Sequence, residues 1–338
     1  MDGTIMIDNK RLDRPIIILG APRSGTTILF RCLALHTDLW HLPAESHQIL
    51  EGPFHPASRG YESNRVTAED IDEKLAQALR TRFYRSAINL NRVWSNPALL
   101  LEGNSVHHRI FNKFLIAGLG KASQFSKNAA IRFLEKTPKN ALRVPMLTRV
   151  FPDAFYVWIT RKATRNIDSL IASWCAVDKI GPVNRKRYGQ FAYPVASQLK
   201  LQDYSDKMWM FALVPGWQNL KGKTLADVAA WQYYQCNAFI SNDLASIETK
   251  RIFSVKFEDF VREPVKIVQH IFDWAELPPS QVAEGFARIL PRVNDAAPRV
   301  SRSTHDLRHS SAVYAAIERL PELDPLQKIM GYEQMVSL

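Results

Sequence analysis

The sequence has little cysteine: three residues in 338, with no C-x-x-C pair and no Cys/His spacing typical of a metal site. The three cysteines are an odd number and lie far apart in the sequence, which argues against a disulfide framework or a zinc centre. No apolar run approaches the ~20 residues that a membrane-spanning helix needs, and residues 1–14 have neither signal-peptide nor transit-peptide character. We therefore expect a soluble, cytoplasmic protein in a reducing environment, with no metal.

Acidic residues are outnumbered, with 33 Asp and Glu against 44 Lys and Arg and a formal net charge of +11. This balance favours an anionic ligand, an anionic acceptor or a negatively charged membrane surface, so peripheral membrane contact stays open. A merely basic surface explains the charge equally well. Because the basic residues are dispersed and no zinc-finger or RNP pattern is present, a nucleic-acid partner is not expected. The sequence does not indicate an oligomeric state.

The chain also lacks internal repeats and low-complexity tracts. Four apolar runs predict buried parallel strands, and helical patterns separate them. The runs are residues 16–19, 131–134, 155–160 and 252–257. This alternation predicts the α/β class, as one P-loop-like, three-layer α/β/α domain over residues 1–338 with a central, mainly parallel sheet.

Three segments depart from the strand–helix alternation. Residues 1–14 read as an N-terminal extension, and residues 41–65 and 176–224 read as long loops. Long loops inside a compact domain are usually functional, so both are candidate walls of an acceptor site, the second as an insertion. Its aromatic residues, including Trp209 and Trp217, fit a small satellite core as well as a substrate wall.

The segment 16–30 is the most informative part of the chain. An apolar run, a turn of small residues and a helix N-terminus form an anion cradle, because unpaired N–H groups and the helix dipole point at one spot. Gly20 and Gly25 match the spacing of the G-x-x-x-x-G-K-[ST] nucleotide loop, but Thr26 stands where that motif needs lysine. Arg23 is the cation of this loop, which therefore predicts a phosphate or phosphosulfate site.

A second anion site is predicted where the third apolar run ends. Arg161 follows this run directly, and Ser169 lies eight residues later in the next helical pattern. An arginine at the carboxyl end of a strand, beside a helix N-terminus, is well placed to bind phosphate through two N–H groups. A surface arginine is the ordinary alternative, and the nearby cradle favours phosphate.

The ordered pair of segments resembles the PAPS-dependent sulfotransferases, whose donor is 3′-phosphoadenosine 5′-phosphosulfate. Residues 151–154 and 257–260 are also similar to that family, and the resemblance spans residues 15–305. The chain departs from it with Lys162-Ala163 in place of Asp-Pro, and with Phe257 where tyrosine is common near the adenine. The resemblance implies that the 3′-phosphate is bound by Arg161 and Ser169. It implies that the 5′-phosphosulfate is bound by Pro22, Arg23, Ser24, Gly25, Thr26 and Thr27.

The resemblance also implies a general base. Glu45 and His47 form a Glu-x-His pattern similar to the heparan-type carbohydrate sulfotransferases, and protein tyrosine sulfotransferases carry a base glutamate in this region. We expect Glu45 to be the base, with its pKa raised by desolvation, and His47 to be a second active-site group or the base itself. The ordinary alternative is a helix-capping carboxylate beside a loop histidine.

Three further residues complete the expected site. Lys136, at the end of the second run, is expected to join Arg23 in stabilising negative charge on the transferred group. Residues 301–304 resemble an element that closes over the donor in tyrosine sulfotransferases, so Arg302 and Ser303 are expected donor contacts. A solvated lysine and a Ser/Thr turn are the ordinary alternatives.

The sequence therefore predicts a metal-independent sulfotransferase. It would move a sulfuryl group in line from PAPS to a hydroxyl of a carbohydrate, glycolipid or other alcohol or phenol, and release PAP (3′,5′-ADP). Two alternatives stay open. A kinase or NTPase would need a loop lysine and a magnesium-binding Asp. A non-catalytic module would bind PAP or another polyanion without transferring sulfate.

Overall fold

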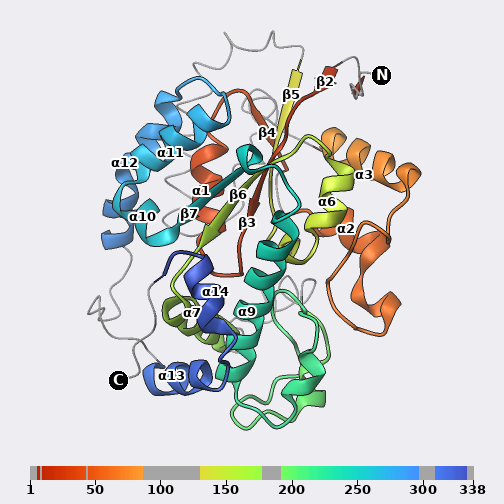
Figure 1. Cartoon of the computed structure of the whole chain (residues 1–338), viewed down its shortest axis with the longest axis vertical. Helices are drawn as coiled ribbons and strands as arrows, with labels where there is room; N and C mark the ends of the chain where they lie inside the picture. The colour runs from red at the N-terminus through yellow and green to blue at the C-terminus, as the bar shows by residue number, and fades with distance from the viewer. Residues whose placement is uncertain are drawn as a thin grey trace.

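The computed structural model of the chain describes residues 6–7, 10–42, 45–86, 130–176, 192–296 and 309–332. A parallel sheet runs through its centre between two layers of helices (Figure 1). The central strands run in the order β4–β5–β3–β6–β7. They are β3 (Ile16–Leu19), β4 (Leu39–His41), β5 (Ala130–Lys136), β6 (Phe155–Thr160) and β7 (Ile252–Lys256). The predicted α/β class with a mainly parallel sheet is confirmed.

A short antiparallel pair extends this sheet at the N-terminal end of the described chain. It consists of β1 (Met6–Ile7) and β2 (Lys10–Leu12), and β2 runs parallel to the first residues of β5. The predicted apolar runs coincide with β3 and β6 and lie within one or two residues of the bounds of β5 and β7. Strand β4 was not predicted, because three residues are too few to give a periodic signal.

Alternate residues of β3 face two different cores, which explains the three layers. Ile17 and Leu19 pack into one apolar cluster, and Ile16 and Ile18 pack into the other. Strands covered on both faces are apolar throughout rather than alternating. The second cluster is covered by α1 (Thr26–Leu33), α10 (Phe257–Arg262), α11 (Pro264–Trp274) and α12 (Gln281–Ala296).

The first cluster is larger and includes residues from the other helices. These are α2 (His47–Phe54), α3 (Glu73–Ser86), α6 (Val144–Val150), α7 (Ala163–Ala176), α9 (Leu225–Leu244), α13 (Ser310–Glu318) and α14 (Leu323–Ile329). Cys32 on α1 is fully buried in the second cluster. None of the described helices is long and apolar enough to cross a membrane.

The prediction of a long loop at residues 41–65 is wrong. This segment contains α2 and the short 3-10 helix η1 (Pro56–Arg59). Its Gly and Pro residues suggested a loop, yet Pro53 lies in the last turn of α2. The buried side chains of Ile49 and Leu50 anchor the helix to the core, so tertiary packing overrides the local propensity.

The described part of the expected insertion, residues 192–224, has little regular structure beyond the 3-10 helices η5 (Ala196–Leu199) and η6 (Trp217–Leu220). Trp209 and Trp217 are buried, with ring centroids 6.1 Å apart. These two side chains therefore belong to the core. Met210 and Ala212 belong to the same core cluster, and residues 210–212 also line a cavity, so this segment contributes both to a core and to a wall.

Candidate functional site

The loop between β3 and α1 is tightly wound, and two glycines make this winding feasible. A Cβ on Gly20 would lie 2.5 Å from Ser24 Oγ and 2.6 Å from the carbonyl oxygen of Ile159. Gly25 has a φ of +100°, and a Cβ there would lie 2.2 Å from the ring of Phe257. The Ser24 N–H donates to the carbonyl oxygen of Ala21 within the loop. The N–H groups that can face an anion are therefore those of the first turn of α1.

The two predicted anion-binding arginines lie side by side. Arg23 Nε donates to Ser169 Oγ at 3.3 Å, and Arg161 Nη1 donates to the carbonyl oxygen of Arg23 at 3.0 Å. The guanidinium of Arg161 also lies 4.7 Å from the ring centroid of Phe257. Burial lowers the pKa of Arg161, so an anion bound beside it would compensate a desolvated cation.

Glu45 and Lys136 form an ion pair at the carboxyl end of β5. Lys136 Nζ donates to Glu45 Oε1 and, at 3.2 Å, to Thr27 Oγ1. The expectation of a raised Glu45 pKa is wrong. Burial does raise it, but Lys136 and His47 lower it by more, and the resulting pKa is about 2. The charged neighbour comes from a strand 91 residues away, so the local sequence could not reveal it.

The segment that carries Glu45 is held onto β5 by a buried carboxylate. Ser46 Oγ donates to Glu135 Oε1 at 2.7 Å, and the Ser46 N–H donates to Thr137 Oγ1 at 2.8 Å. Asn140 Nδ2 donates to Glu135 at 3.0 Å. Burial raises the pKa of Glu135. The side chain of Glu45 bonds to Lys136 and His47. Its contacts are therefore not those of a carboxylate that caps the N-terminus of α2.

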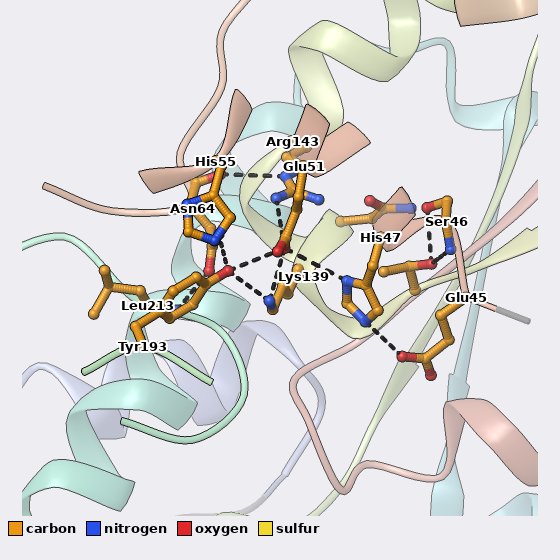
Figure 2. A network of polar contacts seen from close by, with 12 residues as sticks. Glu45, Ser46, His47, Glu51, His55, Asn64, Lys139, Arg143, Tyr193 and Leu213 are labelled. Carbon is orange, nitrogen blue, oxygen red and sulfur yellow. Dashed lines mark hydrogen bonds and ion pairs between the residues drawn. The ribbon is translucent and has the colours of Figure 1, made fainter. Parts of the chain in front are cut away.

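His47 connects Glu45 to a second buried carboxylate, Glu51 (Figure 2). Its Nε2 lies 2.9 Å from Glu45 Oε2, and its Nδ1 lies 3.5 Å from Glu51 Oε1. Glu51 was not predicted. His47 and Glu51 have the i,i+4 spacing of facing residues on a helix, so a correct prediction of α2 would have indicated the pair.

A cavity of about 390 Å³ lies between the cradle and this network. Its cradle side consists of Pro22, Arg23, Gly25, Thr26, Thr27, Arg161 and Phe257. The remaining lining residues are Ile28, Glu45, His47, Pro138, Lys139, Met210, Phe211 and Ala212. Of the remaining predicted site residues, Lys136 and Ser169 bond to lining residues, and Ser24 is buried within the loop.

Arg302 and Ser303 lie outside the described residues. In the part of the chain that the structure describes, no group of three or more His, Cys, Asp or Glu side chains could hold a metal ion. The arrangement thus combines a cationic cradle, a lysine–glutamate pair and a histidine around one cavity. Such a set can bind an anionic group, stabilise negative charge and accept a proton.

Comparisons with known proteins point to one family. The model of the sulfotransferase family matches residues 15–204. A search of curated proteins finds no match.

One similar solved structure is a sulfotransferase domain from the curacin biosynthetic pathway, which is 16% identical to this chain. The match covers 96% of this chain and 99% of that chain, with a TM-score of 0.42. Sulfotransferase STF9 from Mycobacterium avium has 17% identity over 95% of this chain and 78% of its own, with a TM-score of 0.47. A sulfotransferase from Alicyclobacillus acidocaldarius has 13% identity over 95% and 97%, with a TM-score of 0.41. At these scores the structural likeness adds nothing to the family match.

Proposed function

The chain belongs to the sulfotransferase family, and we propose that it transfers a sulfuryl group from PAPS to a hydroxyl acceptor. The observation that carries this proposal is the contact between Arg23, Ser169 and Arg161 at the mouth of the cradle. Two buried polar atoms here, Ser24 Oγ and Arg161 Nε, have no hydrogen-bond partner within the described residues. Buried polar atoms are normally paired, so these two fit a site built for an anionic ligand.

The residues divide between the two ends of the donor. Arg23, Ser24 and the first N–H groups of α1 would hold the 5′-phosphosulfate, and Arg161 with Ser169 would hold the 3′-phosphate. Phe257 would pack against the nucleoside. Arg302 and Ser303 stay predicted contacts.

When bound, the donor supplies a sulfuryl group whose bond to the phosphate oxygen breaks as the acceptor oxygen bonds to sulfur. Lys136 and Arg23 would stabilise the negative charge that develops at the cradle. The sequence favours Glu45 as the base. However, a carboxylate with a pKa of about 2 that is paired with Lys136 is a weak base. His47 Nε2 lies 2.9 Å from Glu45 Oε2, so the two groups form the pair that would receive the hydroxyl proton, with Glu45 also bonded to Lys136.

The acceptor side of the cavity supports a hydroxyl compound with an apolar face. Ile28, Pro138 and residues 210–212 add apolar and aromatic side chains to the lining of the cavity. Phenols and alcohols fit such a lining, and so does the apolar face of a sugar or glycolipid headgroup. A cytoplasmic location stays a prediction.

Transfer of labelled sulfate from PAPS to a panel of phenols, alcohols and sugars tests this function. We expect transfer without added metal, and a fall of about 100-fold or more in kcat for His47→Asn. Glu45→Gln should also lower kcat, through loss of the lysine and histidine contacts. ATP hydrolysis without sulfate transfer, or PAP binding without transfer to any acceptor, would instead support a nucleotidase or a binding module.

A further inference from the structure

We propose that Tyr233 and Gln327 are positioning residues that fix the turn carrying Arg161, and through it the preference of the site for a nucleotide with a 3′-phosphate. This inference deepens the proposed function and rests on it. Both side chains are buried, and neither lines the cavity. They would therefore act on a bound nucleotide only through Arg161.

Two hydrogen bonds fix the backbone where β6 passes into α7. The carbonyl oxygen of Arg161 accepts from the Tyr233 hydroxyl at 2.6 Å. Two residues later, the N–H of Ala163 donates to Gln327 Oε1 at 3.1 Å. N–H groups in the first turn of a helix have no partner within that helix. Ala163 is fully buried, and its N–H is satisfied by a side chain of α14.

Gln327 also connects these two bonds. Its Nε2 donates to the hydroxyl oxygen of Tyr233 at 2.8 Å, while its Oε1 faces the N–H of Ala163. Because an N–H can only donate, Ala163 determines the orientation of the amide. The Tyr233 hydroxyl accepts from this amide and donates its own proton to the Arg161 carbonyl. Burial raises the pKa of the Tyr233 hydroxyl, which therefore keeps that proton.

A second bridge reaches the same turn from the last described residues of the chain. The hydroxyl of Tyr332 donates to Glu258 Oε2 at 2.8 Å, and Glu258 Oε1 accepts from the N–H of Lys162 at 3.1 Å. The N–H of Tyr332 donates to the carbonyl oxygen of Gln327. Helix α14 packs against α9 and lies close to the start of α7 (Figure 1). The turn is therefore held from outside the cavity.

The side chain of Arg161 extends from this fixed backbone to the cradle. Its Nη1 donates to the carbonyl oxygen of Arg23 at 3.0 Å, and its guanidinium lies 4.7 Å from the ring centroid of Phe257. Its buried Nε has no hydrogen-bond partner within the described residues. A phosphate group at this point would supply one. A turn that shifts would misdirect the guanidinium and weaken binding of the 3′-phosphate more than binding of the rest of the nucleotide.

The bond to α14 depends on a residue at which this chain departs from the sulfotransferase pattern. The chain has Lys162-Ala163 in place of Asp-Pro. Proline has no backbone N–H, so a proline at position 163 could not donate to Gln327. The hydrogen bond from Ala163 therefore ties this departure to a specific partner elsewhere in the chain.

The main experiment compares calorimetric titrations of PAP and of adenosine 5′-phosphate, which lacks the 3′-phosphate, into wild type and Tyr233→Phe. We expect wild type to prefer PAP by about tenfold or more. Tyr233→Phe should lower the affinity for PAP about fivefold, while the affinity for adenosine 5′-phosphate changes by less than about twofold. General damage to the fold would lower both affinities alike. Equal losses for the two nucleotides, or no loss for PAP, would overturn the proposal.

A double-variant comparison tests whether the hydroxyl acts through Arg161. Arg161→Ala alone should lose most of the preference for PAP. Adding Tyr233→Phe to it should lower the affinity for PAP by less than about twofold more, because both substitutions remove the same interaction. A further loss as large as that of Tyr233→Phe in wild type would show that the hydroxyl acts by another route, and would refute the proposal.

Gln327→Met is a second test, which does not require Tyr233→Phe to fold. It removes the amide and keeps an unbranched side chain of similar length. The preference for PAP should fall as it does in Tyr233→Phe. A folded Gln327→Met with the wild-type preference would contradict the role of Gln327.

Tyr156→Phe is the matched control. Tyr156 is also fully buried and lies on β6, but its hydroxyl contacts Thr148 at 2.9 Å. This variant should bind both nucleotides as wild type does. A loss of preference equal to that of Tyr233→Phe would mean that removal of any buried hydroxyl has this effect, which would contradict a specific role for Tyr233.

The same titrations separate this inference from the proposed function. If wild type binds PAP and adenosine 5′-phosphate equally well, Arg161 holds no 3′-phosphate, and the proposed donor site fails together with this inference. If wild type prefers PAP and both Tyr233→Phe and Gln327→Met retain that preference, the donor site stands and the positioning role is wrong.

Discussion

Lys136 links two parts of the site that come from distant segments, the loop at Thr27 and the segment at Glu45. Without its ammonium group, Glu45 loses its strongest favourable partner and the cradle loses a cation. We expect Lys136→Ala to lower kcat by about 100- to 1,000-fold, in line with the removal of one group that stabilises transition-state charge. Single-turnover kinetics measure this step directly. Lys162→Ala is the control, because Lys162 is exposed one residue beyond Arg161; equal losses in both variants would argue against a specific role.

The low pKa of Glu45 predicts how the free energy of unfolding depends on pH. A carboxyl group whose pKa is lower in the folded state contributes stability above its usual value of 4.5 and loses it as the pH falls towards about 2. Wild type should therefore lose more stability than Glu45→Gln, which cannot titrate, when the pH falls through this window. Urea unfolding of both proteins at several pH values in this window measures the difference. Parallel losses would show that the ion pair with Lys136 does not form in solution.

Gly25 tests the close packing of the cradle. Gly25→Ala would place a Cβ 2.2 Å from the Phe257 ring in a backbone conformation that favours glycine, so the loop must shift. We expect its affinity for PAP to fall about tenfold or more, as measured by calorimetry. Gly60→Ala is matched, since Gly60 also has a positive φ but has nothing within 4 Å of the added Cβ. That variant should bind PAP as wild type does, and an equal loss in both would point to backbone strain alone.

At the scale of elements, the sequence revealed what depends on local pattern. Strands β3 and β6 were predicted with their observed bounds, because a short apolar run between turn signals is itself the signature of a buried parallel strand. Helix α2 was missed because Gly52 and Pro53 reduce its local propensity, while the contacts of Ile49 and Leu50 with the core are long-range. Because α2 was not predicted, the pairing of His47 with Glu51 was not predicted either.

If core packing stabilises α2, its apolar face should matter more than its exposed face. Leu50 is fully buried, so Leu50→Ala should lower the free energy of unfolding by about 2–5 kcal/mol. Gln48 is exposed on the same helix, and Gln48→Ala should change it by less than about 0.5 kcal/mol. Chemical denaturation of the three proteins measures both values. A small effect of Leu50→Ala would mean that the helix is held by its polar network instead.

At the scale of the whole molecule, the parallel sheet brings the predicted residues together. Arg23 follows β3, Lys136 ends β5 and Arg161 follows β6, and these three strands are neighbours in the sheet. Motif order along the chain predicted an anion-binding arginine after each of two strands, and the structure shows these two arginines in contact. Most of the buried polar network was not predictable, because the hydrogen-bond donors to Glu51 lie 88 to 142 positions away in the sequence. No local pattern encodes such contacts.

The net charge of +11 gives a prediction for the molecule as a whole. Because salt screens long-range attraction, affinity for PAP should fall about tenfold or more between about 50 mM and 500 mM NaCl. Calorimetric titrations of PAP across that range measure this effect. The same titrations with uncharged adenosine measure the salt dependence that does not come from the phosphates. Salt-independent PAP binding would contradict an electrostatic site.

Calorimetric titration of PAP into wild type, Arg23→Ala and Arg161→Ala tests the central claim most directly. That claim is that one nucleotide with two phosphate groups is held by the cradle and by the arginine that follows β6. We predict saturable binding of one PAP per chain and a loss of affinity of about tenfold or more in each variant. Absence of binding to wild type, or binding that neither substitution weakens, would contradict the account.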